Sequence, residues 1–260
     1  MCANRLAPSS SPAGSSFRLT KHDIHLWFLQ LDGSDSAVTF CRSVLPAEEL
    51  QRANRYRFKD HRRNFSIAHG VLRFLLARYL DAHPAMIEFG YGPKGKPEIA
   101  APRTDLRFNL SHSGEMAAYA LTLDVDIGVD IERLRRMNHL IQIATRFFSS
   151  QELGDLMALP EHIRQHAFLL CWTRKEAYIK SVGDGLSVPL DSFCVTVHPD
   201  DPARFVHINY DCRAAAQWTL QDIVSIPGYA AAVAYRDPPR QLHISTLAGA
   251  DQAIERLGFR

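Results

Sequence analysis

The chain has 260 residues and a formal net charge of +2, and 46% of its residues are hydrophobic and 22% charged. This composition is close to that of an average globular protein, which argues against an intrinsically disordered chain. No apolar run reaches the roughly 18 residues that a membrane-spanning helix needs. The length fits one large domain or two small ones, and we favour two halves.

Residues 1–17 are rich in Ser and Pro and lack the apolar segment of a signal peptide, so we expect a flexible tail and a cytoplasmic protein. The five cysteines, at positions 2, 41, 171, 194 and 212, form no CxxC pair. Their odd number and irregular spacing favour reduced thiols and argue against a disulfide framework or a zinc site.

The first part of the chain predicts one strand, two helices and a turn-rich connection. Residues 24–31 (IHLWFLQL) read as a strand, and residues 45–50 (LPAEEL) start a helix, with an early proline followed by acids. Apolar residues at helical spacing predict an amphipathic helix over residues 61–80. A stretch rich in turn residues, YGPKGKPEIA, then precedes a short apolar strand, LRFNLS.

Residues 121–132 alternate strictly between apolar and polar side chains. This period of two predicts a strand, or a hairpin that turns near residues 124–126. Asp130 and Glu132 are two residues apart on this strand, so their carboxylates should emerge on the same face while Ile131 points into the core.

The second part of the chain predicts two helices and several short strands. Ser149 and Glu152 have the spacing of a capping box, and a further helix covers residues 166–180 before two glycines stop it. Three of its residues share one stripe because they follow each other at four-residue steps: Trp172, Glu176 and Lys180. Helices and strands alternate without a βαβ rhythm, so we expect the α+β class.

A cluster of basic residues lies between positions 52 and 63, although the net charge is small. Its members are Arg52, Arg55, Arg57, Lys59, Arg62 and Arg63. A solvated helix face explains such a cluster without any function. The alternative is a surface that binds phosphate or an acidic partner.

Asp130, Glu132 and Glu176 are candidate metal ligands. Carboxylate oxygens without Cys or clustered His favour Mg²⁺ or Mn²⁺ over zinc. Acids on the exposed face of a half-buried strand are also common without a metal, and Glu176 with Lys180 fits an ordinary surface pair. Two carboxylates held side by side repel each other, however, and a bound metal would relieve that repulsion.

The segment Ser111-His112-Ser113-Gly114 follows a predicted strand. Its hydroxyls, imidazole and accessible backbone N–H groups suit a phosphate, and loop capping is the alternative. A Ser–His nucleophile pair is disfavoured because adjacent side chains on a strand point in opposite directions. The spacing of His162 and His166 allows a metal site, but the polar segment EHIRQH is more typical of an exposed helix.

The motifs follow one another in a specific order: KGKP, FNLSHSG, IGVDIE, RFFSSQE and WTRKEAYIKSVGDGLSVPLDSF. In this order the chain resembles the 4′-phosphopantetheinyl transferase superfamily, in the long-chain branch typified by the surfactin-synthetase activator. The resemblance covers residues 95–193 almost without interruption, and PGYAAAV near residue 230 extends it.

The resemblance implies a monomer of two similar α+β halves related by a pseudo-twofold axis, with coenzyme A in the cleft between them. The N-terminal half, residues 18–122, would supply nucleotide and phosphate contacts. The C-terminal half, residues 123–260, would carry the metal site and the catalytic helix.

The resemblance also implies roles for individual residues. Asp130, Glu132 and Glu176 match the metal ligands, and Lys180 matches a contact to the diphosphate. Ser111 and His112 match part of the 3′-phosphate site, and Lys96 and Pro97 match contacts to the nucleotide end. Arg52 and Arg63 are further expected phosphate contacts, since the lysines that the type member places before its first long helix appear here as Gln51 and Asn54.

The implied reaction transfers the 4′-phosphopantetheine arm of coenzyme A to a serine of an apo-carrier protein, an acidic helical bundle, with Mg²⁺ or alternatively Mn²⁺. Glu176 or a metal-bound water would be the base, and Lys180 would stabilise the departing 3′,5′-ADP. Neither a nucleic acid nor a membrane is an expected partner. Two rival functions stay open: a basic module that binds nucleic acid, and a metal-dependent phosphodiesterase that hydrolyses coenzyme A.

Overall fold

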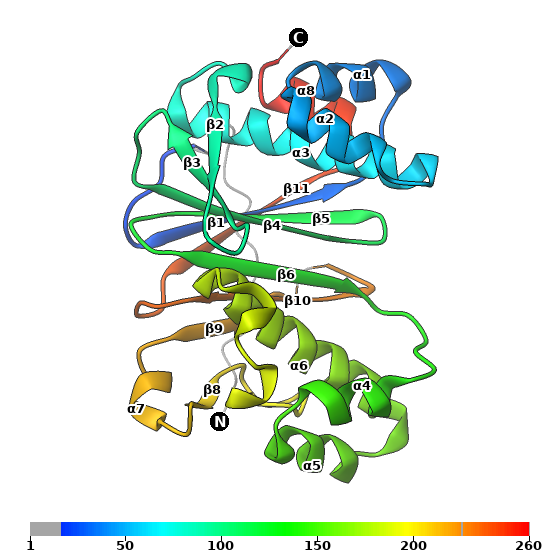
Figure 1. Cartoon of the computed structure of the whole chain (residues 1–260), viewed down its shortest axis with the longest axis vertical. Coiled ribbons are helices and arrows are strands. Elements are labelled where there is room, and N and C mark those ends of the chain that lie inside the picture. Colours follow the sequence, from blue (N-terminus) through cyan, green and yellow to red (C-terminus); the bar gives the residue numbers. More distant parts are fainter. Residues whose placement is uncertain (1–16, 225, 260) are drawn as a thin grey trace.

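The computed structural model describes residues 17–224 and 226–259 (Figure 1). The tail expected over residues 1–17 therefore lies outside the described residues except for Phe17, whose ring stacks on Trp27 at 5.7 Å. Within the described ranges, no helix combines the length and hydrophobicity that a membrane span requires. Cys41, Cys171, Cys194 and Cys212 are all free thiols, as their spacing predicts.

Helices and strands alternate irregularly, and the fold is of the expected α+β class. The helices are α1 (Asp35–Ser43), α2 (Ala47–Asn54), α3 (Lys59–Leu80), α4 (Leu140–Phe147), α5 (Ser150–Ala158), α6 (Glu161–Val182), α7 (Cys212–Ala215) and α8 (Ala250–Arg256), with short 3₁₀ turns at Pro84–Met86, Gly185–Ser187 and Leu190–Ser192. The strands are β1 (Asp23–Gln30), β2 (Glu88–Tyr91), β3 (Pro97–Ala101), β4 (Leu106–Ser113), β5 (Met116–Leu123), β6 (Ile127–Arg133), β7 (Phe193–Val195), β8 (Phe205–Ile208), β9 (Thr219–Asp222), β10 (Tyr229–Tyr235) and β11 (Gln241–Leu247).

Two sheets lie face to face across the middle of the molecule, and helices cover their outer sides (Figure 1). The first sheet has the strand order β11-β1-β5-β4, and the second has the order β6-β10-β9. Helices α1, α2, α3 and α8 lie on the side of the first sheet, and α4, α5 and α6 lie on the side of the second. The longest helix on each side, α3 or α6, has 22 residues.

Strand β1 is apolar on both of its faces because each face meets a different layer. Ile24, Leu26 and Phe28 pack between the two sheets. Trp27 and Leu29 alternate with them and pack under the helices of the first sheet. The continuous apolar run that predicts this strand therefore reflects burial on both sides.

The alternating pattern over residues 121–132 forms two strands, but these strands do not form a hairpin. β5 ends at Leu123 and β6 begins at Ile127, and β6 pairs with β10 in the second sheet. The connection, with Asp124 in the left-handed region at φ 66°, carries the chain from one sheet to the other. Alternation determines the face of each side chain but not the partner strand, so neither a single strand nor the alternative of a hairpin describes this segment.

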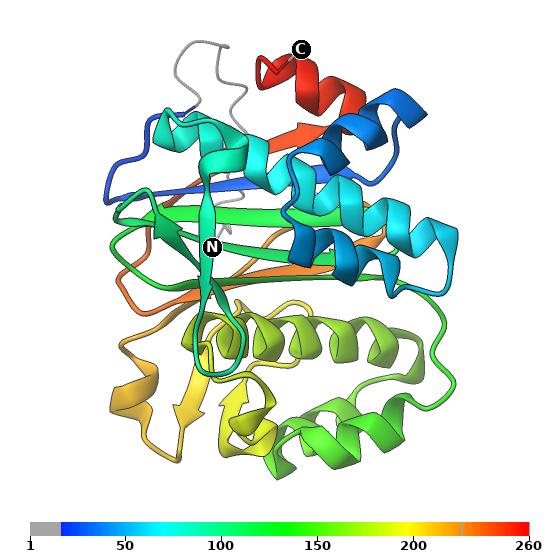
Figure 2. The same cartoon turned by 45° about the horizontal axis from the view of Figure 1, so that its top comes forward.

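The last strand and the last helix of the chain pack against elements from its first part. β11 pairs in parallel with β1 of the first sheet, and α8 packs beside α1 and α3 (Figure 2). Asp251 of α8 accepts hydrogen bonds of 2.7 and 2.5 Å from the backbone N–H and hydroxyl of Ser34. The end of the chain thus completes the N-terminal half.

Candidate active site

The candidate site forms where helix α6 crosses strand β6, and Gly128 makes that crossing possible. A Cβ atom at this position would lie 2.0 Å from the carbonyl oxygen of Ala177 and 2.4 Å from the backbone nitrogen of Ser181. Only a residue without a side chain lets the helix approach so closely. The stripe of α6 that carries Glu176 and Lys180 is thereby brought against the strand that carries Asp130 and Glu132.

Asp130 is 3% exposed and lies at the centre of a hydrogen-bonded triangle. Its Oδ1 accepts hydrogen bonds from Lys180 Nζ at 2.6 Å and from Ser111 Oγ at 2.9 Å. Lys180 Nζ also donates to Ser111 Oγ at 2.8 Å. The other oxygen, Asp130 Oδ2, is buried and has no hydrogen-bond partner among the described residues. The triangle joins β4, β6 and α6, which are distant in sequence.

Glu132 lies beside this triangle and accepts a 2.6 Å hydrogen bond from the hydroxyl of Ser113. Alternate residues of β4 thus donate hydrogen bonds to alternate residues of β6: Ser111 donates to Asp130, and Ser113 donates to Glu132. Desolvation raises the pKa of Glu132, and the charge of Asp130 adds to that shift. Because Ser111 and Ser113 share a face of β4, these two bonds place Asp130 and Glu132 on the same face of β6.

Glu176 belongs to the same group of acids. Desolvation raises the pKa of Glu176, and the negative charges of Asp130 and Glu132 raise it further. A carboxyl group with a raised pKa is a better proton acceptor near neutral pH than an ordinary one. Glu176 can therefore act as a general base at this position.

The three acids fit a hard divalent cation by chemistry, although Lys180 now neutralises Asp130. In the described part of the chain, no three acidic, His or Cys side chains stand in the arrangement of a metal site. The buried Asp130 Oδ2 without a partner and the mutual repulsion that raises two carboxyl pKa values both favour a cation here. Oxygen donors alone suit Mg²⁺ or Mn²⁺.

His112 lies next to this group on β4 and faces a concentration of positive charge. Desolvation lowers the pKa of His112, and so do the nearby charges. These charges come from α2, α3 and α6: Arg52, His61, His69 and Lys180. A ring of basic groups from both halves around one imidazole suits a bound phosphate.

His61 and His69 are functional candidates that the sequence analysis missed. His69 stacks on Phe65 at 3.9 Å, and Arg52 lies over the same ring at 5.5 Å. The other side of His69 is held by Glu49, whose Oε1 lies 2.8 Å from His69 Nδ1. Positions 61, 65 and 69 follow each other at four-residue steps, so the spacing that identified the stripe on α6 could have found them.

Two expected site residues, Arg63 and Lys96, have other partners in this structure. Arg63 donates to Asp35 at 3.0 Å and to the carbonyl of Gly33. Lys96 donates to the carbonyl of Ser181 at 2.8 Å, at the C-terminal end of α6, and Pro97 begins β3 beside it. The hydrogen bond of Lys96 therefore goes to the residue that follows Lys180 in α6. The partners of Arg63, in contrast, do not belong to the group of residues around His112.

Other residues of the WTRKEAYIK motif hold α6 in place. Lys175 is fully buried and donates to both oxygens of Glu152 at 2.7 Å and to the carbonyl of Phe193 at 2.8 Å. Arg174 donates to both oxygens of Asp222. The motif therefore combines residues that face the site with residues that fix the helix on its other sides.

Comparisons with known proteins match both halves of the chain. Residues 32–123 match the family model described as 4′-phosphopantetheinyl transferase, N-terminal, and residues 126–234 match the 4′-phosphopantetheinyl transferase superfamily. The chain is 36% identical over 225 residues to 4′-phosphopantetheinyl transferase HetI of Nostoc sp. (strain PCC 7120 / SAG 25.82 / UTEX 2576), which covers 86% of this chain and 92% of HetI. It is 34% identical over 158 residues to 4′-phosphopantetheinyl transferase Sfp of Bacillus subtilis (strain 168), which covers 61% of this chain and 69% of Sfp.

Proposed function

Because the chain belongs to the 4′-phosphopantetheinyl transferase superfamily, we propose that its site moves the phosphopantetheine arm of coenzyme A to a serine of an apo-carrier protein and releases 3′,5′-ADP. The observation that carries the proposal is the triangle of Ser111, Asp130 and Lys180 beside two further acids. This group brings together an ammonium cation, a carboxylate that can act as a base, and oxygen atoms that can bind a metal, all between the two halves of the chain.

The coenzyme would lie across the boundary between the halves. His112, supported by Arg52, His61 and His69, would hold the 3′-phosphate. The expected contact of Ser111 with the same phosphate would require its hydroxyl to leave Asp130, to which it now donates. Lys96 and Pro97, at the end of α6, would contact the nucleotide end. The group of positive charges around His112 supports this assignment, because a phosphate would compensate their mutual repulsion.

Asp130, Glu132 and Glu176 would hold Mg²⁺, with Mn²⁺ as the alternative. When bound, the ion would neutralise charge on the diphosphate of coenzyme A. Lys180 would then leave Asp130 and turn to the diphosphate, where its ammonium group stabilises the departing nucleotide. The 2.6 Å contact supports this exchange, since Lys180 already stands where positive charge is needed.

The transfer step forms one bond and breaks another at the same phosphorus. The oxygen of the carrier serine bonds to the phosphorus that bears the pantetheine arm, and Glu176 accepts the proton of that hydroxyl. The bond from this phosphorus to the bridging oxygen breaks, and 3′,5′-ADP leaves with the electron pair. The position of Glu176 beside Asp130 and Glu132 supports its role as the base.

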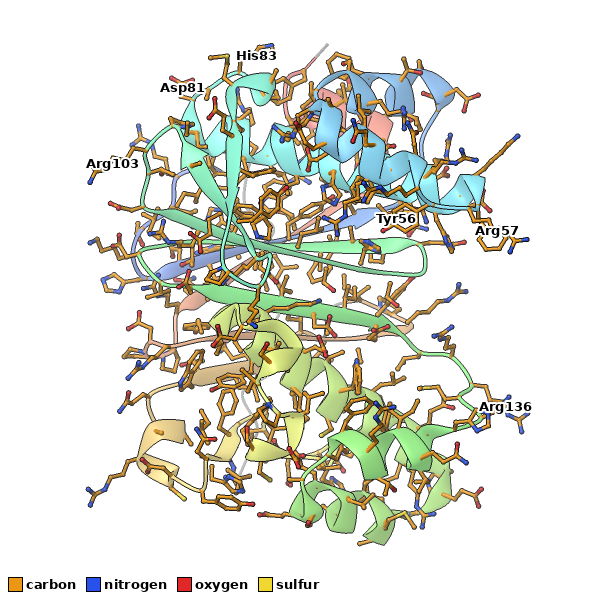
Figure 3. The ribbon with its side chains drawn as sticks, in the orientation of Figure 1. Tyr56, Arg57, Asp81, His83, Arg103 and Arg136 are labelled. Carbon is orange, nitrogen blue, oxygen red and sulfur yellow. The ribbon has the colours of Figure 1, made fainter. Side chains whose placement is uncertain are left out.

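The acidic carrier would dock on a basic side of the molecule. Arg57 and Arg136, one from each half, project from the same side in Figure 3. Exposed apolar residues adjoin them in sequence: Phe58 is 59% exposed and Leu134 is 37% exposed. Leu134 is two residues beyond Glu132, so a carrier on this side would have its serine near the acids. Complementary charge would guide the encounter.

One assay tests the proposal. The protein is incubated with coenzyme A, Mg²⁺ and a panel of apo-carrier proteins from fatty-acid, polyketide and peptide synthesis, and each carrier is weighed by mass spectrometry. We expect at least one carrier to gain the mass of the arm, and Asp130→Asn to lower the rate about a hundredfold or more without unfolding the protein. Hydrolysis of coenzyme A without any modified carrier would instead indicate a phosphodiesterase.

A further inference from the structure

A second basic feature lies beside the start of α3 and involves residues other than those that surround His112. A cavity of about 460 Å³ opens between α1, α2 and α3. Four of the residues that line it are cationic, and only one is acidic; the cations are Arg42, Lys59, Arg62 and Arg63, and the acid is Asp60. Such an excess of one charge in a concave surface attracts small ions of the opposite sign.

Two hydrogen bonds hold Arg42 in this cavity, and its guanidinium group keeps further N–H donors. Its Nη1 donates to the hydroxyl of Ser66 at 3.0 Å, and its Nη2 donates to Asn54 Oδ1 at 3.3 Å. Ser66 is fully buried, so the guanidinium group is anchored to the protein interior. A guanidinium group has five N–H donors, and these two bonds leave the others for a ligand.

The start of α3 adds further positive charge. The N-cap residue of α3, Phe58, offers no side-chain hydrogen bond to the first turn, so the helix begins with free N–H groups beside Lys59. The dipole of this helix places partial positive charge at the same end. Among the described residues, Lys59 and Arg62 form no ion pair with an acid.

The cavity is separate from the candidate active site. The charges that act on His112 come from Arg52, His61, His69 and Lys180, and none of these residues lines the cavity. The basic cluster at positions 52–63 therefore contributes to both features. Arg52 acts on His112, whereas Lys59 and Arg62 line the cavity.

We propose that this cavity is a binding site for the phosphate group of a small anion, either inorganic phosphate or a phosphomonoester. A fixed guanidinium fork, a second arginine and a lysine line the same cavity and supply several donors, as a dianionic tetrahedral group requires. The cavity lies between three helices and opens to solvent, so a small anion can enter it directly. Occupancy would fasten α2 against α3, the two helices that also carry Arg52 and His69.

Calorimetric titration with inorganic phosphate at constant ionic strength tests this site. Arg62→Gln should weaken one binding event about tenfold, which is the lower end for a charge-assisted hydrogen bond. Arg57→Gln is the matched control, because Arg57 belongs to the same basic cluster and does not line the cavity. Arg52→Gln should also leave this event unchanged, because Arg52 does not line the cavity.

A second variant and a second ligand complete the experiment. Lys59→Gln should reproduce the effect of Arg62→Gln, and unchanged circular dichroism would show that neither variant unfolds the chain. Glycerol 3-phosphate in place of phosphate distinguishes a site for phosphomonoesters from one for the free ion. Equal phosphate affinity in wild type, Arg62→Gln and Lys59→Gln would overturn the proposal, and so would loss of all phosphate binding in Arg52→Gln.

Discussion

Glu49 shows how one buried acid can support the site without touching a substrate. It is 5% exposed, and its two oxygens are shared between His69 at 2.8 Å and Arg73 Nε at 2.8 Å. Desolvation alone would raise the pKa of Glu49. The hydrogen bond and charge of His69, together with Arg73, outweigh desolvation and lower the pKa below its ordinary value.

This lowered pKa predicts the direction in which pH changes stability. The ionised Glu49 should stabilise the fold above the ordinary pKa that a glutamate has in the unfolded chain, and this contribution should be lost as the pH falls through the lower folded-state pKa. Glu49→Gln should lower the free energy of unfolding at pH 7 by about 3 kcal/mol, as for a broken buried pair. Urea unfolding at several pH values between 7 and 3 measures both effects.

As the pH falls from 7 to 3, the free energy of unfolding should decrease less in Glu49→Gln than in wild type. Glu48→Gln is the control, because Glu48 is exposed on the same helix and should leave the unfolding curves unchanged. If Glu49→Gln and wild type lose stability in parallel as the pH falls, the assignment of this titration to Glu49 is wrong.

Single residues of the site could be predicted from the sequence only where a local period fixed their direction. Alternation placed Asp130 and Glu132 on one face of β6, and the four-residue steps on α6 aligned Glu176 with Lys180. The contact of Lys180 with Asp130 joins residues 50 positions apart, and that of Lys180 with Ser111 joins residues 69 positions apart. No local pattern encodes such pairs, because they depend on how the elements pack.

At the scale of elements, the crossing of α6 over β6 determines whether the site exists. Gly128 should not tolerate even one methyl group, since its added Cβ would lie 2.0 Å from a backbone oxygen. Gly128→Ala should lower the free energy of unfolding by at least about 2 kcal/mol, and activity should fall because α6 moves away from Asp130. Thermal unfolding and the transfer assay measure the two effects.

Gly154 supplies the matched control for this substitution. It lies within α5, and a Cβ atom there would meet nothing within 4 Å. Gly154→Ala should keep full activity and raise stability by up to about 1 kcal/mol, since alanine favours a helix more than glycine does. Equal stability of the Gly128 and Gly154 variants would contradict the steric explanation of the crossing.

The elements themselves were more predictable than their pairing. The capping box of Ser149 and Glu152 is present at the start of α5, and the expected helix over residues 61–80 is α3. Both signals are local, because a cap and an apolar stripe act within a few turns. The move of β6 into a second sheet depends on Val129 and Ile131 meeting side chains from the first sheet, which no local signal reveals.

At the scale of the whole molecule, one chain supplies both walls of the site. Ser111 and His112 come from the first sheet, and Asp130 and Lys180 come from the second sheet and its helix. We therefore expect a functional monomer. Sedimentation at the concentration of the transfer assay should give the mass of one chain, 29.3 kDa. An obligate trimer that loses activity on dilution would refute this expectation.

The parallel pairing of β11 with β1 also has a consequence for synthesis on the ribosome. Strands β1, β5 and β4 can pair as soon as β5 has emerged, whereas β11, at Gln241–Leu247, is among the last segments to be made. Until then, one edge of β1 is paired with β5 and the other edge, which β11 will cover, is open. During that interval, a chaperone that shields β1 would protect the chain from aggregation.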